Sequence, residues 1–269
     1  MIRVEREKVT FYQFPILREF PELIHFVSGR KGGVSDGGQA SLNLGFMEED
    51  RDERVLANRT LLAETVGCVV DDFTLGEQKH TTHIEIVTQA QRRLGGREKI
   101  TRLPFTDALI TREPRVCVMV LAADCVPVLL YDPRKQAVAA VHAGWRGTVG
   151  RIVTKTVERM QSEFESCPRD IVAGIGPSIG PCCFEVGEEV IKAAREGLGN
   201  LQGLVEPGKM AGKFHLNLWE ANRRQLLDMG VTRIDVAGIC TVCHRDEFFS
   251  YRGDRGDTGR FGAGIMLNI

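Results

Sequence analysis

The 269-residue sequence lacks a charge excess of either sign, a long uninterrupted apolar run and an export signal. Lys and Arg number 35 and Asp and Glu number 36, so the formal net charge of −1 indicates neither a basic surface for nucleic acid nor an acidic tail. The longest apolar run, residues 116–131, is interrupted by Asp124 and is too short and too polar to span a membrane. The first eleven residues are too densely charged for a signal peptide. We therefore expect a cytoplasmic protein that binds neither nucleic acid nor membranes.

Linkers, internal repeats and low-complexity tracts are also lacking. The one loose stretch, residues 31–39, contains four glycines and is typical of a surface loop. With 43% hydrophobic and 26% charged residues, the chain can bury a sizeable core, and we expect one domain over residues 1–269. Eight cysteines without an export signal favour free thiols or metal ligands over a disulfide framework.

Short apolar runs typical of strands alternate with amphipathic segments typical of helices. Strands are predicted over residues 23–28, 84–87, 108–111, 116–121, 126–131, 137–141, 171–175, 234–239 and 264–268. Helices are predicted over residues 52–66, 149–164, 185–196 and 216–229. Because several strands follow one another with no helix between them, the pattern favours a mixed α+β fold over a doubly wound parallel sheet.

Two reactive side chains stand where apolar runs end. Cys125 follows Asp124 at a break between two runs, and His142 follows the run 137–141 and precedes a Gly-Trp-Arg-Gly turn. Binding and catalytic groups are often found at such strand ends. Either residue alone is more simply a buried thiol or a core histidine. Together, and beside glycine and proline, they favour a functional site.

His80, with His83 three residues further on, is a third candidate. Two histidines and one cysteine on separate strand ends can bind a metal, either as catalytic zinc with an open position or as a blue-copper centre. Spacing does not choose between these metals. It also leaves open a metal-free pair in which Cys125 is the nucleophile and His142 the base.

The remaining motifs are weaker. Residues 176–180 fit G-x-S-x-G, but Pro181 follows where a nucleophile elbow needs a helix, so a glycine-rich turn is the simpler interpretation. Residues 240–244 match a haem attachment pattern that would require export. We expect the cysteines at 182, 183, 240 and 243 to be buried thiols that the chemistry does not need, because no set of histidines accompanies them.

Five arginines beside glycines, turns or predicted helices are candidates for holding an anion: Arg30, Arg59, Arg146, Arg252 and Arg260. The guanidinium fork matches phosphate and carboxylate. Each arginine alone is more simply a solvated surface charge, so their role depends on whether some of them converge.

Distinctive short motifs occur in order along nearly the whole chain. They are Ser41-Leu-Asn-Leu-Gly45, Asn58-Arg59, Gln78 with His80, Thr106-Asp-Ala-Leu-Ile-Thr111, Ala123-Asp-Cys-Val-Pro-Val128, His142-Ala-Gly-Trp-Arg-Gly147, Gly176-Pro-Ser-Ile-Gly180, Phe184-Glu-Val-Gly187, Phe248-Phe-Ser-Tyr-Arg252 and Thr258-Gly-Arg260. With these motifs the chain resembles the laccase-domain family, first named multicopper polyphenol oxidoreductases and later recognised as zinc-dependent purine nucleoside phosphorylases.

The resemblance implies a single-domain α/β/β/α layered sandwich with mixed sheets and a metal, zinc rather than copper, held by His80, Cys125 and His142. It implies phosphorolysis of adenosine, inosine, guanosine and methylthioadenosine to the base and ribose 1-phosphate. It also implies deamination of adenosine to inosine.

Within that reaction we expect Cys125 and His142 to be catalytic, and Arg59 or Arg146 to hold the phosphate. Substrate binding is expected from three further residues: Asn43, Arg30 and Arg260. Asp124 is open as a proton donor or as a structural residue.

One departure concerns the first histidine: the family usually has Gln-Val-His-Gly, whereas this chain has Lys79 and Thr81 around His80. His83 therefore competes as a ligand, although we expect His80. The chain has six histidines, too few for the four coppers of a true multicopper oxidase.

Three alternatives stay open: a metal-free cysteine hydrolase or deamidase, a copper-dependent polyphenol oxidase, and a non-enzymatic regulator on the same scaffold. The hydrolase would be insensitive to chelators, and the regulator would need an exposed partner surface, which the sequence does not reveal. The sequence leaves the preferred purine open, and a homodimer is compatible with it.

Overall fold

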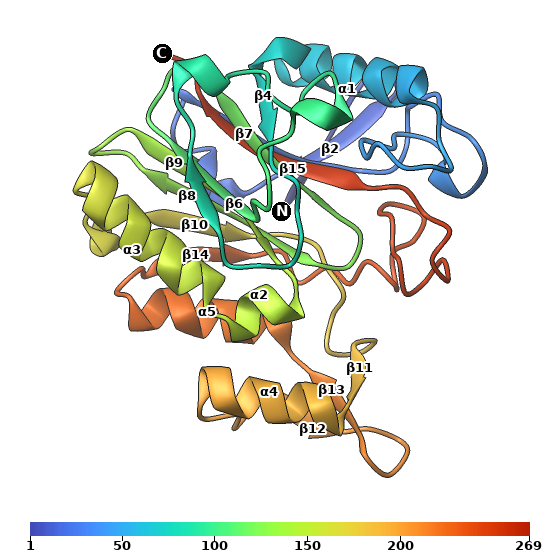
Figure 1. Ribbon diagram of the computed structural model, residues 1–269, viewed down its shortest axis with the longest axis vertical. Helices are drawn as coiled ribbons and strands as arrows, with labels where there is room; N and C mark the ends of the chain where they lie inside the picture. The colour runs from blue at the N-terminus through green and yellow to red at the C-terminus, as the bar shows by residue number, and fades with distance from the viewer.

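The apolar runs in the middle of the chain form strands that are buried on both faces. β8 (Val126–Asp132) and β9 (Ala137–Ala143) pair antiparallel, and every residue in both strands is buried. A strand of this kind needs a covering layer on each side. The computed structural model, which describes residues 1–269, provides these layers (Figure 1).

Two six-stranded sheets stack face to face. The first has the order β1 (Ile2–Arg6), β2 (Val9–Gln13), β3 (Leu23–Ser28), β15 (Phe261–Leu267), β7 (Cys117–Ala122) and β4 (Phe73–Leu75). The second has the order β14 (Arg233–Val236), β10 (Val172–Ile175), β8, β9, β6 (Ala108–Thr111) and β5 (Ile84–Ile86). Neighbouring strands are antiparallel except in the pairs β4–β7, β5–β6 and β10–β14.

The alternation of side chains along β7 shows how the layers divide the core. Val118 and Val120 point into the core between the sheets, whereas Cys117 and Met119 point into the core under α1 (Asp52–Val66). On the other outer face, α2 (Trp145–Val149), α3 (Ile152–Phe164) and α5 (Leu218–Asp228) cover β8, β9 and β10 (Figure 1).

The expected α+β fold, an α/β/β/α sandwich, is confirmed. No helix combines the length and the apolar character that crossing a membrane requires.

Several elements differ from the sequence prediction. β1 was missed because it is exposed and charged, and β4 was missed because it has too few residues for a pattern. The buried strand β2 was missed as well. The Gly-Trp-Arg-Gly segment is not a turn: it opens the short helix α2, which Gly150 and a left-handed Arg151 separate from α3.

A small third sheet also escaped prediction. β11 (Glu185–Gly187) and β12 (Val205–Pro207) flank β13 (Lys213–Leu216), and α4 (Glu188–Leu198) packs on them. In Figure 1 this unit forms the end of the molecule farthest from α1. The unit begins directly after Phe184, and the Leu216 amide at the end of β13 donates to the Phe184 carbonyl at 3.2 Å.

Candidate active site

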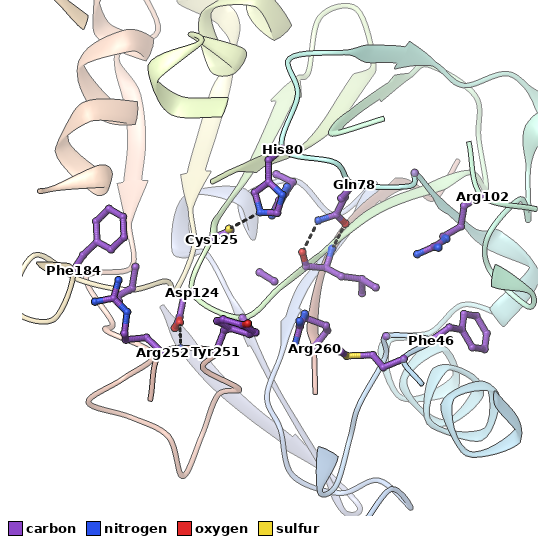
Figure 2. Close-up of a pocket in the computed structure, with 18 residues that line it drawn as sticks. Phe46, Gln78, His80, Arg102, Asp124, Cys125, Phe184, Tyr251, Arg252 and Arg260 are labelled. Carbon is purple, nitrogen blue, oxygen red and sulfur yellow. Dashed lines mark hydrogen bonds between the residues drawn. The ribbon is translucent and has the colours of Figure 1, made fainter. Parts of the chain in front are cut away.

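Three metal-ligating side chains from distant segments converge at one edge of the sandwich. His80 lies in the loop between β4 and β5, Cys125 in the turn between β7 and β8, and His142 near the end of β9. One ligand atom from each lies within 4.8 Å of the others. Cys125 Sγ is 3.7 Å from His80 Nε2, as the dashed line in Figure 2 shows.

The turn that presents Cys125 is fixed by Asp124, whose backbone is left-handed with a φ of 88°. The Asp124 carboxylate accepts hydrogen bonds from Thr241 Oγ1, Ser250 Oγ and the Arg252 amide, each at 2.6 Å. Both oxygens are therefore engaged. This geometry favours the structural role for Asp124 over that of a proton donor.

Asp107, to which the sequence analysis gave no role, connects the two histidines. Its carboxylate lies 2.8 Å from His142 Nδ1 and also accepts hydrogen bonds from the amides of His80 and Thr81 at 3.0 and 2.7 Å. His142 Nδ1 is thereby occupied, which directs His142 Nε2 toward Cys125 and His80. A carboxylate on the outer nitrogen of a ligating histidine is the usual arrangement around zinc. The signal in the sequence was an Asp directly before a buried strand.

The electrostatics favour a thiolate among these groups. Burial disfavours ionisation of Cys125, but the His142 charge and hydrogen bonds from both histidines outweigh it and lower the pKa of Cys125 to about 6. Burial also disfavours protonation of His142, but the Cys125 charge and the Asp107 hydrogen bond raise the pKa of His142 to about 9. The pKa of Asp107 is lowered because its interactions with His142 and Thr81 outweigh burial.

The donor set fits a metal ion. Two imidazoles and one thiolate are ligands that zinc and copper both accept. Gly144 keeps space beside them, because a Cβ at this position would lie 2.9 Å from both Cys125 Sγ and His80 Cδ2. His83 is outside the group: it is exposed, and its Nε2 lies 3.4 Å from Glu85.

The three ligating residues line a cavity of about 490 Å³. Three arginines and three aromatic side chains from other loops contribute to its wall: Arg102, Arg252, Arg260, Phe46, Phe184 and Tyr251 (Figure 2). Gln78 anchors the wall, since its amide group bonds the backbone N–H and C=O of Leu121. The wall thus combines cationic groups with flat apolar surfaces.

Among the residues expected to bind substrate, Arg260 lines the cavity. Its Nη1 donates to the carbonyls of Thr258 and Gly259, which leaves Nη2 for another acceptor. Asn43 is fully buried behind this wall and is not part of it. Its side-chain oxygen accepts hydrogen bonds from the amides of Gly45 and Arg260, so it positions both segments.

Arg59, expected to hold phosphate, is not at the cavity, and this expectation is corrected. Its guanidinium is fully buried and donates to the carbonyls of Leu44, Gly95 and Gly96. It joins two loops and has no access to a ligand.

The expectations that Arg146 holds phosphate and that Arg30 binds substrate are corrected as well. Arg146 is exposed on α2 and lies 4.3 Å from the Trp145 ring centre, outside the cavity. The Arg30 guanidinium donates to the Ala40 and Arg245 carbonyls and pairs with Asp254, so it holds loops and binds no substrate here. Arg102 and Arg252 line the cavity instead. Arg102 was not among the arginines predicted from the sequence.

The G-x-S-x-G turn has no nucleophile. Ser178 is fully buried and accepts a hydrogen bond from Trp219 Nε1. The four cysteines at 182, 183, 240 and 243 were expected to be buried, but Cys182 and Cys243 are exposed, and the four lie together.

The chain is similar to known proteins over nearly its whole length. A family model described as multi-copper polyphenol oxidoreductase laccase matches residues 24–268. A Bacteroides thetaiotaomicron protein named purine nucleoside phosphorylase is 40% identical over 270 residues, with 100% of both chains covered. A protein named adenosine deaminase RL5, from an unknown prokaryotic organism, is 37% identical over 237 residues, 87% of this chain and 90% of the relative. The crystal structure of YlmD from Geobacillus stearothermophilus has a TM-score of 0.93 and 36% identity, covering 99% of this chain and 98% of that chain.

Proposed function

The chain belongs to the family described as multi-copper polyphenol oxidoreductase laccase, and from this membership we propose that it is a zinc-dependent purine nucleoside phosphorylase that also deaminates adenosine. Its substrates are purine nucleosides, among them adenosine, inosine, guanosine and methylthioadenosine, together with phosphate. Residues 1–269 act as one catalytic domain in the cytosol, where thiols stay reduced. The relatives named purine nucleoside phosphorylase and adenosine deaminase support both activities.

The observation that carries the proposal is the convergence of His80, Cys125 and His142 in a cavity that also holds guanidinium groups. A cavity of about 490 Å³ is in the range that binds small molecules. Phe46, Phe184 and Tyr251 offer apolar surfaces for a purine ring. The ligand set can hold the metal, the arginines can bind the phosphate, and the aromatic side chains can pack against the purine base.

We assign the phosphate to the arginines that line the cavity, with Arg260 as the first choice. It lines the same cavity as the three ligating residues, and only its Nη1 is engaged in hydrogen bonds to the chain. In phosphorolysis, a phosphate oxygen bonds to the anomeric carbon of ribose while the bond from that carbon to the purine nitrogen breaks. The purine keeps the electron pair and takes up a proton. A guanidinium beside the phosphate orients this nucleophile without being consumed.

Zinc is our choice for the metal because the ligand set is a single His₂Cys group, with no histidine cluster to hold further coppers. When bound there, zinc would supply a Lewis acid that activates water near neutral pH. The chain's own residues do the rest. Asp107 holds His142 in one orientation, and the lowered pKa of Cys125 provides a thiolate ligand.

Product analysis with adenosine, with and without phosphate, tests this proposal. With phosphate we expect adenine and ribose 1-phosphate, plus some inosine; without phosphate, adenine formation should stop while inosine formation persists. Chelation should abolish both activities, and zinc should restore them. Adenine release without phosphate, or activity that resists chelation, would overturn the assignment in favour of a hydrolase.

The phosphate assignment has its own test in Arg260→Gln. This variant should raise the phosphate KM and spare deamination, because only phosphorolysis uses the anion. Arg146→Gln, which changes an exposed arginine outside the cavity, is the matched control and should leave the phosphate KM unchanged. Equal loss of both activities in Arg260→Gln would contradict the assignment.

A further inference from the structure

Four cysteines from two loops form a second cluster outside the His₂Cys group. Cys182 and Cys183 follow the glycine-rich turn 176–180, and Cys240 and Cys243 belong to a tight turn after β14. All four Sγ atoms lie within 4.8 Å of one another. The two pairs are about sixty residues apart in the chain, so the fold alone brings them together.

The spacing of the sulfur atoms is that of ligands around one ion. Cys243 Sγ lies 3.8 Å from Cys182 Sγ and 3.6 Å from Cys183 Sγ. With a Zn–S distance of about 2.3 Å, neighbouring sulfurs of a tetrahedral site lie about 3.8 Å apart. All four thiols are free, and none is at the roughly 2 Å separation of a disulfide.

The surroundings also suit a thiolate site that is filled from solvent. Cys182 and Cys243 are exposed, so an ion can reach the group, while Cys240 is buried and anchors it. The Gly180 amide donates to Cys240 Sγ at 3.3 Å, as outer hydrogen bonds commonly do for metal-bound thiolates. No carboxylate or imidazole belongs to the group, which leaves four sulfur ligands and no open position.

We propose that Cys182, Cys183, Cys240 and Cys243 bind a structural zinc ion, separate from the metal of the active site. A closed set of four thiolates is a structural ligand set, since it offers no position for a substrate or water. The inference does not depend on the proposed function.

The zinc ion would brace one wall of the active-site cavity. Phe184 lines the cavity directly after Cys183, whose carbonyl accepts a hydrogen bond from Arg252 at 3.5 Å. Thr241, inside the Cys-x-x-Cys turn, donates to Asp124, which fixes the turn of Cys125. One ion would therefore join two loops. One carries Phe184 and accepts the hydrogen bond from Arg252, and the other carries Thr241, which supports the turn of Cys125.

The test is a metal analysis in a background that removes the other site. The His80→Ala/His142→Ala protein, purified and dialysed against zinc-free buffer, should retain about one zinc per chain. Adding Cys182→Ser and Cys243→Ser should lower that zinc content at least tenfold. Both positions are exposed, so circular dichroism should show an unchanged fold. Cys167→Ser, which changes a partly exposed thiol outside the cluster, is the matched control and should retain the ion.

Two further readouts secure the interpretation. Cobalt in place of zinc should give the visible absorption bands of a tetrahedral thiolate site, and Cys243→His should keep the metal because imidazole is also a zinc ligand. A background protein that holds no zinc would overturn the proposal. So would iron in place of zinc, or a mass 2 Da below that of the four free thiols, which would mean a disulfide.

Discussion

Replacing Arg59 by Met tests whether this arginine holds loops together or holds phosphate. The side chain is fully buried, and its Nε and Nη2 donate to the Leu44 carbonyl at 2.8 and 2.6 Å. Its Nη1 donates to the carbonyls of Gly95 and Gly96. Met fills a similar volume but cannot donate, so the variant leaves three carbonyl groups without a partner in the interior.

The magnitude follows from these three acceptors. An unsatisfied buried polar group costs about 1–3 kcal/mol, which for three groups is about 3–9 kcal/mol. Part of this is offset, because burial lowers the pKa of Arg59 to about 9 and so opposes its charge. We expect a net loss of about 3–5 kcal/mol in the free energy of unfolding, and a fall in Tm of roughly 5–10 °C.

Urea unfolding measures this loss, with an unchanged m-value as the sign that the two states are the same as in the wild type. Arg54→Met, on the same helix but partly exposed and paired with the exposed Asp36, is the control and should cost less than about 1 kcal/mol. Any residual activity of Arg59→Met should fall equally in phosphorolysis and deamination. Wild-type stability together with a selective rise in the phosphate KM would refute the reasoning.

Three further predictions concern the ligand shell and an interior histidine. Asp107→Asn should weaken zinc binding about 10–100-fold in competition with a chelating dye, because His142 loses its orienting carboxylate; unchanged affinity would contradict that role. His80→Ala should lose active-site zinc and activity, whereas His83→Ala should retain both; the reverse would show that the wrong histidine was chosen. His25 is buried, accepts a hydrogen bond from the Phe14 amide, and has its pKa lowered by burial to about 4 from 6.5. On acidification the unfolded chain therefore takes up this proton before the folded protein does, so the free energy of unfolding should fall by up to about 3 kcal/mol as the pH drops from 6.5 to 4. In urea titrations at each pH, His25→Gln should flatten this dependence. An equal slope of unfolding free energy against pH in both proteins would exclude His25 as the cause.

Much of the fold follows from periodicity in the sequence. The helix over residues 52–66 and the strand over residues 23–28 have the predicted bounds. The helix ends at the left-handed Gly67, and the strand is a short, mostly apolar run. The same pattern contained a signal about Arg59: it lies between Val55 and Leu62 at helical spacing, on the face that becomes buried. An arginine on an apolar face indicates an interior role, and that inference was available from the sequence.

The site was harder to predict, because it depends on which distant loops meet. His80, Cys125 and His142 could be selected by residue type and by their place at strand ends, and the structure does bring them together. Arg102 had no comparable local signal. The two cysteine pairs were visible in the sequence, but nothing local showed that they meet. Their neighbours come from segments tens of residues away, and only the stacking of the two sheets and the return of the chain through β13 and α5 place them.

The most direct test of the central claim is a ³¹P NMR measurement of inosine incubated with phosphate and the zinc-loaded protein. We predict a ribose 1-phosphate signal that grows in equal amounts with hypoxanthine and is absent with Cys125→Ala. Hypoxanthine without ribose 1-phosphate, or no cleavage of inosine at all, would contradict the assignment of this cavity to phosphorolysis.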